Sequence, residues 1–196
     1  MTEAVHSPLA LVVLGLLAEE PMHAYRIRQL IRQRGKDGVV NVARSNSVYQ
    51  TIDRLGRSGL IRVRATTRGT GRPDRTTYEI TADGRSALRE WLVKTLSTPA
   101  REFPEFPAAL ATMSATTPTE AMRALTERVE ALTVRIKDLD KPPNVPRLFL
   151  VEDEYALAMA RAELRWVRSL IADLESKELY WTRKWVDEIR SQFGTE

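Results

Sequence analysis

Cysteine is absent from this chain of 196 residues, and histidine occurs only twice, as His6 and His23. Without cysteine the chain has neither a disulfide framework nor a thiolate metal site, and two histidines alone rarely build a structural zinc site. Long hydrophobic runs are also missing, because the apolar stretch Leu9–Ala18 is shorter than the about 20 residues that span a bilayer. It lacks a preceding basic segment and a credible cleavage site. We therefore expect no membrane association and a cytoplasmic location.

Patterns typical of enzymes are missing as well. No nucleophile–base arrangement is evident, and the glycine-rich stretch 69–73 lacks the lysine and the spacing of a phosphate-binding P-loop. We therefore expect a protein that is not an enzyme and that needs no cofactor and no metal. Hydrophobic residues make up 43% of the chain, which is enough for a packed core.

Charge is distributed unevenly along the sequence. Residues 1–94 contain 16 Lys and Arg against nine Asp and Glu, whereas residues 95–196 contain 14 against 17. A basic half joined to a mildly acidic half is typical of a polyanion-binding module followed by an assembly domain. Chance scatter of solvated charge is the alternative that charge alone leaves open.

The first half has the order of elements of a winged helix-turn-helix. In the third helix Val48, Ile52 and Leu55 recur at helical spacing and should face the core, and Gly59 should end the helix. Alternating apolar and basic residues then predict a strand with one solvated face. The predicted elements are helices from Pro8 to Glu20, from His23 to Arg34 and from Ser45 or Asn46 to Arg57, strands at 60–66 and 76–81, and a fourth helix from Thr81.

Two groups of residues in this half are candidates for DNA contact. Short polar side chains near the start of a helix are the type that reads base edges in a major groove, whereas arginines favour phosphates. The arginines around the strand turn are more than an ordinary hairpin needs. An ordinary polar helix face and a charged solvated loop are the alternatives. The recognition-helix candidates are Arg44, Ser45, Asn46, Ser47, Tyr49, Gln50 and Arg54, and the wing candidates are Arg68, Arg72 and Arg75.

The second half reads as helical, after a break at Pro99, Pro104 and Pro107. Residues 117–120 predict a capped helix start for a helix that ends near Leu139. A last helix is predicted from about Leu148 to Phe193, with a possible kink. Its steps of three and four form a coiled-coil-like seam, for which a partner subunit is the economical explanation. The predicted dimerisation residues are Leu157, Ala160, Leu164, Val167, Ile171 and Leu174.

Aromatic residues of the chain suggest either a pocket for a small effector or ordinary core and interface packing. The candidates for such a pocket are Trp91, Phe103, Phe106, Tyr155 and Trp166.

Three stretches together resemble the PadR family of bacterial transcriptional regulators. They are LALVVLGLLAEEPMHAYRI, SVYQTIDRLGRSGLI and GRPDRTTYEITADGRSALREWL, which are similar to the family's opening helices, third helix, and wing with the following helix. The chain departs from the family's pattern at Ala24, where Gly is frequent, and in PDRTTY, where a Pro-Arg-Lys-Tyr-Tyr-like run is common.

The resemblance implies a homodimer that binds near-palindromic double-stranded DNA as a repressor and is released by a small aromatic or drug-like effector. The fold class expected is mainly α with a small β wing. We expect a winged helix-turn-helix DNA-binding domain over residues 1–96 and a helical dimerisation and effector domain over residues 97–196. A winged-helix adaptor that binds proteins without specific DNA binding is the alternative function.

Overall fold

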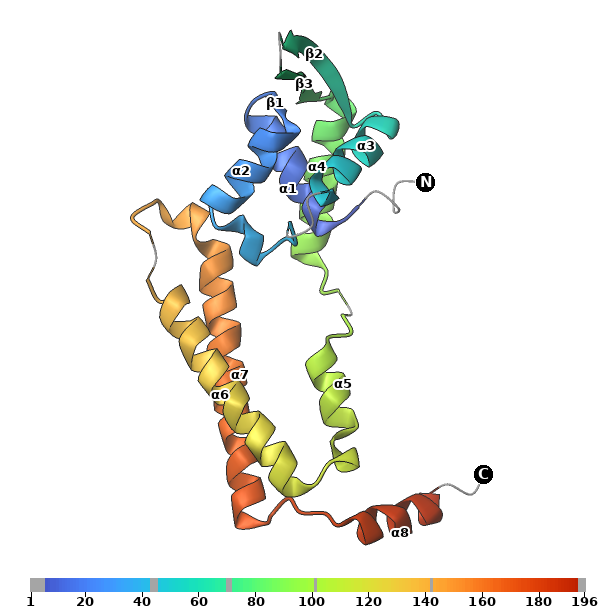
Figure 1. Cartoon of the computed structure of the whole chain (residues 1–196), viewed down its shortest axis with the longest axis vertical. Helices are drawn as coiled ribbons and strands as arrows, with labels where there is room; N and C mark the ends of the chain where they lie inside the picture. Colours follow the sequence, from blue (N-terminus) through green and yellow to red (C-terminus); the bar gives the residue numbers. More distant parts are fainter. Residues whose placement is uncertain (1–5, 43–45, 70–71, 101, 142, 194–196) are drawn as a thin grey trace. The chain divides into compact units, whose positions relative to one another are not determined.

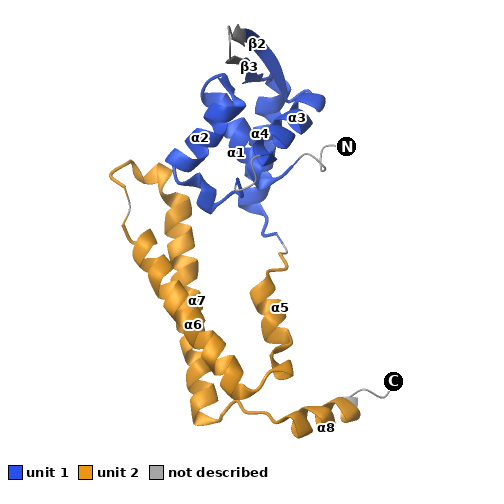
Figure 2. Cartoon of the chain, in the orientation of Figure 1, with its two compact units in different colours: residues 1–101 blue, residues 102–196 orange. Residues whose placement is uncertain are grey.

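The computed structural model describes residues 6–42, 46–69, 72–100, 102–141 and 143–193. The chain divides into two compact units, residues 1–101 and residues 102–196, which Figure 2 colours separately. Helices predominate in both units, and the sheet found among the described residues lies in unit 1. The predicted fold class, mainly α with a small β wing, is confirmed.

Unit 1 is a helical core with a three-stranded antiparallel sheet, drawn in blue to green in Figure 1. A short 3₁₀ turn, η1, separates its second and third helices. In chain order the described elements are α1 (Pro8–Glu19), β1 (Met22–His23), α2 (Ala24–Gln33), η1 (Lys36–Gly38), α3 (Ser47–Arg57), β2 (Ile61–Gly69), β3 (Arg72–Ile80) and α4 (Ala82–Ser97).

Helix α1 is the centre of the core of unit 1. The Ser7 hydroxyl accepts a hydrogen bond from the Ala10 backbone N–H at 3.2 Å, and Pro8 occupies the first turn, where a missing N–H costs nothing. The helix is apolar on nearly every side and packs against α3, α4 and β3. The predicted core face of α3, formed by Val48, Ile52 and Leu55, is buried against it.

An ion pair connects the ends of the first two helices. The Arg34 guanidinium donates to both carboxylate oxygens of Glu19, at 2.6 and 2.7 Å. This hydrogen bonding lowers the pKa of Glu19 and raises the pKa of Arg34. Arg34 therefore supports the fold locally by joining the ends of α1 and α2.

The sheet has the strand order β1-β3-β2. In the long hairpin Ile61 lies opposite Ile80, and both side chains are buried. The short strand β1 was not predicted: Met22 pairs with Tyr78 and His23 with Thr77 on the other edge of β3. Two residues carry too little period-two signal to be recognised as a strand.

The hairpin and α4 are joined at Thr81 and Gly84. Thr81 caps α4, because its hydroxyl accepts a hydrogen bond from the Gly84 backbone N–H at 3.0 Å and lies 2.8 Å from the carbonyl oxygen of Gly59. A Cβ at Gly84 would lie 2.0 Å from the carbonyl oxygen of Leu60. Gly59 itself has φ +71°, in the left-handed region that favours glycine just past a helix end. This joint holds α4 against the chain that leaves α3.

Unit 2 is built from helices alone among its described residues and is drawn in orange in Figure 2. The short helix α5 was not predicted. Its prolines are compatible with a helix, because Pro104 precedes it and Pro107 lies in its first turn, where proline is tolerated. In chain order the elements are α5 (Glu105–Ala111), η2 (Met113–Ala115), α6 (Pro118–Leu139), η3 (Arg147–Phe149), α7 (Val151–Ser176) and α8 (Arg183–Phe193).

Helices α6 and α7 pack side by side and provide most of the core of unit 2. The predicted start of α6 is confirmed: Thr117 and Glu120 form a reciprocal capping box. The hydrogen bond from the Thr117 backbone N–H lowers the pKa of the Glu120 carboxyl. Leu125 of α6 and Val167 of α7 are buried in the shared core.

The prediction of one helix from Leu148 to Phe193 was wrong. Helix α7 ends at Ser176, and Lys177 follows with φ +63°, a left-handed C-terminal cap. The indole N–H of Trp181 then donates to the carbonyl oxygen of Thr116 at 2.7 Å. This bond and the burial of Trp181 fix the connection to α8 beside the start of α6, and a sequence pattern on one helix does not contain that information.

Candidate nucleic-acid interface

Helix α3 presents a polar surface opposite its buried face. Asn46, Tyr49 and Gln50 are exposed and Ser47 is partly exposed. Asn46 occupies the N-cap position, but among the described hydrogen bonds its side chain makes no cap. The predicted residues Arg44 and Ser45 lie outside the described residues. The first turn of α3 therefore holds amides, a hydroxyl and a phenol in the position that can reach base edges.

The second turn of α3 is organised around a buried threonine. The hydroxyl of Thr51 donates to the Ser47 carbonyl oxygen at 2.9 Å and accepts a hydrogen bond from the Arg54 guanidinium at 3.2 Å. Arg54 is thereby oriented along the helix, with its side chain still exposed. Asp53 forms an exposed ion pair with Arg57 at 3.0 Å, which offsets the negative charge on this side of α3.

The wing is the β2–β3 hairpin. Arg75 lies on β3 opposite Thr67 and is exposed. The backbones of Arg68 and Arg72 belong to the two strands, but their side chains lie outside the described part of the structure. Arg62 and Arg64 both approach Glu79, at 2.7 and 3.9 Å. These two strand arginines are therefore partly neutralised, in keeping with the interpretation that they keep this face solvated.

The sequence did not identify the start of α2 as part of this surface. The His23 side chain caps α2, because its Nδ1 accepts a hydrogen bond from the Arg26 backbone N–H at 3.0 Å. The aromatic ring of Tyr25 follows and is 66% exposed. Together with Tyr49 and Arg75, these residues line a cleft of about 380 Å³ in unit 1. This surface was missed because the β1–β3 pairing that brings these residues together was not predicted from the sequence.

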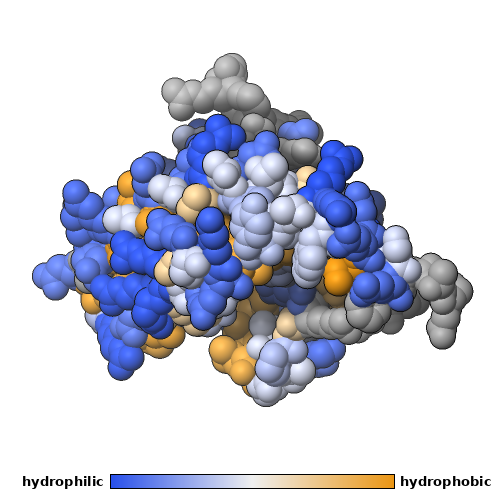
Figure 3. All heavy atoms as spheres, turned by 90° about the horizontal axis from the view of Figure 1, so that it is seen from below, coloured by the Kyte–Doolittle hydropathy of each residue, from blue (hydrophilic) through white to orange (hydrophobic). Residues whose placement is uncertain are grey.

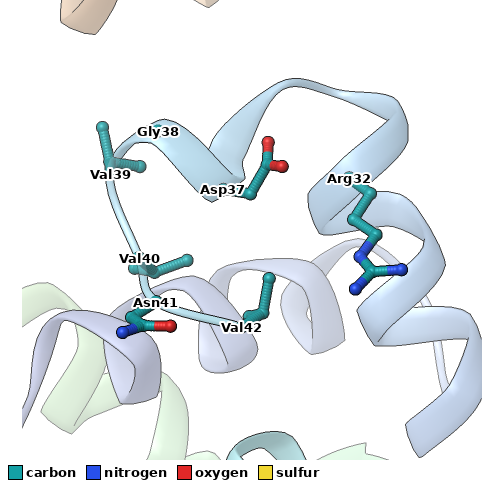
Figure 4. Close-up of a pocket in the computed structure, with 7 residues that line it drawn as sticks. All are labelled: Arg32, Asp37, Gly38, Val39, Val40, Asn41 and Val42. Carbon is teal, nitrogen blue, oxygen red and sulfur yellow. The ribbon is translucent and has the colours of Figure 1, made fainter. Parts of the chain in front are cut away.

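A second depression in unit 1 has a volume of about 510 Å³ and lies under the loop after η1. Arg32 of α2 and residues 37–42 line it, and Figure 4 shows these side chains. Both charge signs occur in the lining, with Arg32 and Asp37. Val40 and Val42 are buried, so the loop is fixed to the core by two apolar side chains.

The predicted effector residues have different surroundings. Trp91 is buried in the core of unit 1 and its ring meets that of His6 edge-on at 5.0 Å. In unit 2, Phe106 meets Trp166 edge-on at 6.3 Å, whereas Phe103 and Tyr155 are 84% and 67% exposed. Trp91 therefore packs in the core of unit 1. Of the five predicted effector residues, Phe106 and Trp166 are the two whose rings lie together.

A charged pair borders these two aromatic rings. The Arg128 guanidinium lies 3.4 Å from the centroid of the Phe106 ring, and its Nε donates to the Glu163 carboxylate at 2.6 Å. Stacking on a ring and a carboxylate partner together satisfy the guanidinium. The arrangement ties α5 to both long helices of unit 2.

The predicted dimerisation seam on α7 is divided between two environments. Ala160, Val167 and Leu174 are buried within unit 2. Only the partly exposed members, Leu157, Leu164 and Ile171, retain surface that a second chain can contact. Apolar patches interrupt the hydrophilic surface on the face that Figure 3 shows. Large exposed apolar side chains of unit 2 include Val134, Leu148, Tyr155, Met159, Trp166 and Trp185.

Within the described residues, no helix is long and apolar enough to cross a membrane. The same part of the chain contains no group of three or more His, Asp or Glu side chains arranged to hold a metal ion.

Comparisons with known proteins agree with this architecture. Residues 13–90 match the transcriptional regulator PadR-like family. No curated protein matches the chain. Three similar solved structures are Bacillus subtilis PadR in complex with operator DNA, the same protein in complex with p-coumaric acid, and the Vibrio cholerae virulence activator AphA.

The likeness to these structures extends over most of each chain. The identities are 22%, 20% and 22%, and the TM-scores are 0.64, 0.68 and 0.61, in the order given. The matches cover 85%, 86% and 86% of this chain and 98%, 99% and 99% of the others. Identities this low establish a shared fold. Together with the family match, they show that residues 13–90 of this chain are similar to the PadR-like family model and that the chain shares the fold of these structures.

Proposed function

We propose that this chain is a homodimeric, sequence-specific DNA-binding repressor, not an enzyme, that acts in the cytoplasm. The observation that carries the proposal is the exposed polar first turn of α3, which belongs to the same unit as the arginine-bearing β2–β3 hairpin. A helix of this composition fits a major groove, and an arginine wing gains affinity by releasing counterions from the backbone. In this proposal residues 1–96 bind DNA and residues 97–196 join two copies.

The relatives support the finer parts of the proposal. Bacillus subtilis PadR has been solved with operator DNA and with p-coumaric acid, an aromatic carboxylic acid. By analogy we propose a near-palindromic operator and release by a small aromatic effector. Two α3 helices related by a two-fold axis would contact half-sites roughly 34–36 Å apart. The Phe106–Trp166 pair is the part of unit 2 that offers aromatic side chains to such an effector.

Selection of bound fragments from random duplex DNA, repeated with a panel of aromatic acids, tests the proposal. We expect one palindromic motif to be enriched and an acid from the panel to release it. Enrichment of no motif, with no duplex binding even at low salt, would instead favour the protein-interaction adaptor. Enrichment that no compound reverses would leave a DNA-binding regulator and contradict the effector.

Variants of α3 and of the wing should affect DNA binding differently. Asn46→Ala and Gln50→Ala should relax preference at particular base pairs, by about 1–3 kcal/mol for each bidentate hydrogen-bond pair that is removed. Arg75→Ala should weaken binding to all duplexes alike and reduce the salt slope by about one. Mobility shifts at several salt concentrations measure both effects, with Arg165→Ala, an exposed arginine of unit 2, as the control. If Gln50→Ala weakens binding to specific and random DNA equally, then Gln50 positions the protein on the duplex and does not read a base pair.

The dimer is tested at the exposed part of the α7 seam. Leu164→Glu with Ile171→Glu should give a monomer in light scattering, because two charges would be buried at a symmetric apolar contact. Ala172→Glu adds one charge at an exposed position of α7 and should leave the mass unchanged. Circular dichroism checks that the double variant remains helical. A folded double variant that is still a dimer and binds DNA would show that this seam is not the dimer interface.

A further inference from the structure

The 380 Å³ cleft of unit 1 lies where three segments of the sequence meet. The start of α2 forms one side with Tyr25, Arg26 and Gln29, and α3 contributes Tyr49. Residues 75, 76 and 78 of β3 complete the lining. The cleft therefore touches both the recognition-helix candidates and the wing candidates, and it adds a segment that belongs to neither group.

Backbone pairing fixes the position of the cleft. Met22 and His23 pair with Tyr78 and Thr77 of β3, so the residue directly before α2 belongs to the wing sheet. The His23 cap at Arg26 then sets the direction in which α2 leaves that edge. Because the strand pairing and the His23 side-chain cap both hold the backbone at this point, the side chains of the first turn of α2 are positioned before any ligand arrives.

The lining has the chemistry of a site for an oxygen anion. Among its described lining residues it contains two guanidinium groups, Arg26 and Arg75, together with three phenol hydroxyls, a threonine hydroxyl and an amide, and none of these described residues carries a carboxylate. Arg26 gives one donor to the Gln29 side chain at 3.2 Å, which leaves further N–H groups for a ligand. Tyr25 and Tyr49 are 66% and 54% exposed, so these aromatic residues do not serve mainly to fill the core.

We propose that this cleft binds one backbone phosphate of duplex DNA in each subunit, with Tyr25 and Arg26 as contacts beside Tyr49 and Arg75. The inference rests on the proposed DNA-binding function and adds the start of α2 to it. Tyrosine hydroxyls and arginines are usual donors to phosphates, and such contacts set register without reading sequence. A phosphate held between α3 and the wing fixes how deeply α3 enters the groove. The positive end of the α2 dipole adds to the attraction.

The first test compares variants at the start of α2 on specific and random duplexes. Tyr25→Phe and Arg26→Ala should each weaken binding to both DNAs by roughly tenfold, as expected when a hydrogen bond to a charged group is removed. Arg26→Ala should also reduce the salt slope by about one, whereas Tyr25→Phe should leave it unchanged. The matched controls are Arg32→Ala, an exposed arginine two turns along α2, and Tyr180→Phe, an exposed tyrosine of unit 2. Both controls should bind like the wild type.

A second test locates the phosphate. Single neutral methylphosphonates are placed along one strand of the selected duplex. In each half-site, one methylphosphonate position should lower the affinity of the wild-type protein. The same substitution should not lower the affinity of the Tyr25→Phe, Arg26→Ala double variant, because that variant no longer contacts the phosphate. Thermal melting confirms that the variants are folded. Wild-type affinity of both single variants, or equal sensitivity of wild type and double variant at every position, would overturn this inference and leave the proposed function intact. Failure of the wild type to bind any duplex would overturn both.

Discussion

Gly84→Ala is expected to destabilise unit 1 by about 3 kcal/mol, near the upper end of the cost of overpacking a core. A Cβ at this position would lie 2.0 Å from the Leu60 carbonyl oxygen and 2.8 Å from a side-chain carbon of Ile80. The first of these atoms is backbone, held by hydrogen bonds from Thr81, so no side-chain rotation relieves the clash. For a unit of this size the melting temperature should fall by roughly 12–24 °C.

Gly56→Ala is the matched control for this variant. Gly56 lies in α3, is exposed, and nothing lies within 4 Å of a Cβ added there. Alanine restricts the unfolded chain and should therefore stabilise the protein by about 0.5–1 kcal/mol. Differential scanning calorimetry measures both variants. Opposite shifts in melting temperature are expected, and an unchanged melting temperature for Gly84→Ala would show that α4 does not approach Leu60 this closely.

The second large effect concerns the core of unit 2. Val167 is fully buried, and aspartate at this position would place an unpaired carboxylate between α6 and α7. Burial of an unpaired charge destabilises by several kcal/mol, and the aspartate pKa would have to rise for the residue to remain buried. Val167→Asp should therefore abolish protection of the α6 and α7 amides in hydrogen exchange at neutral pH.

Ser169→Asp introduces the same side chain two residues further along α7, at an exposed position. It should change the free energy of unfolding by no more than about 0.5 kcal/mol, as is usual for surface substitutions, and amide protection should stay like that of the wild type. Because the carboxylate must become neutral to stay buried, acidic pH should partly restore Val167→Asp and not change the control. Full protection of Val167→Asp at neutral pH would mean that Val167 does not lie in the α6–α7 core.

The apolar spacing along α7 does not distinguish a dimer contact from packing within one chain. The seam from Leu157 to Leu174 has the spacing of a helix contact, and the spacing is the same whether the contacting helix belongs to the same chain or to another. In the structure every second member, Ala160, Val167 and Leu174, is buried within unit 2. The assignment of the remaining members to a dimer therefore stays a proposal, and the light-scattering experiment decides it.

The sequence by itself determined the elements whose signals are local. The buried face of α3, the Thr117–Glu120 capping box and the Thr81 start of α4 all follow from spacing or from capping within one turn. The mainly helical fold with a small wing follows from the order of these signals, because each element was specified within about ten residues.

The tertiary structure alone decided which distant residues share a surface. The two-residue strand β1 brings Tyr25 and Arg26 to the wing through pairing partners more than fifty residues away, and Trp181 ends the long helical region by bonding to Thr116. The close approach of Gly84 to Leu60 likewise joins remote segments, and so does the packing that buries half of the α7 seam. Such contacts depend on how complete elements pack, and no short window of sequence contains both partners.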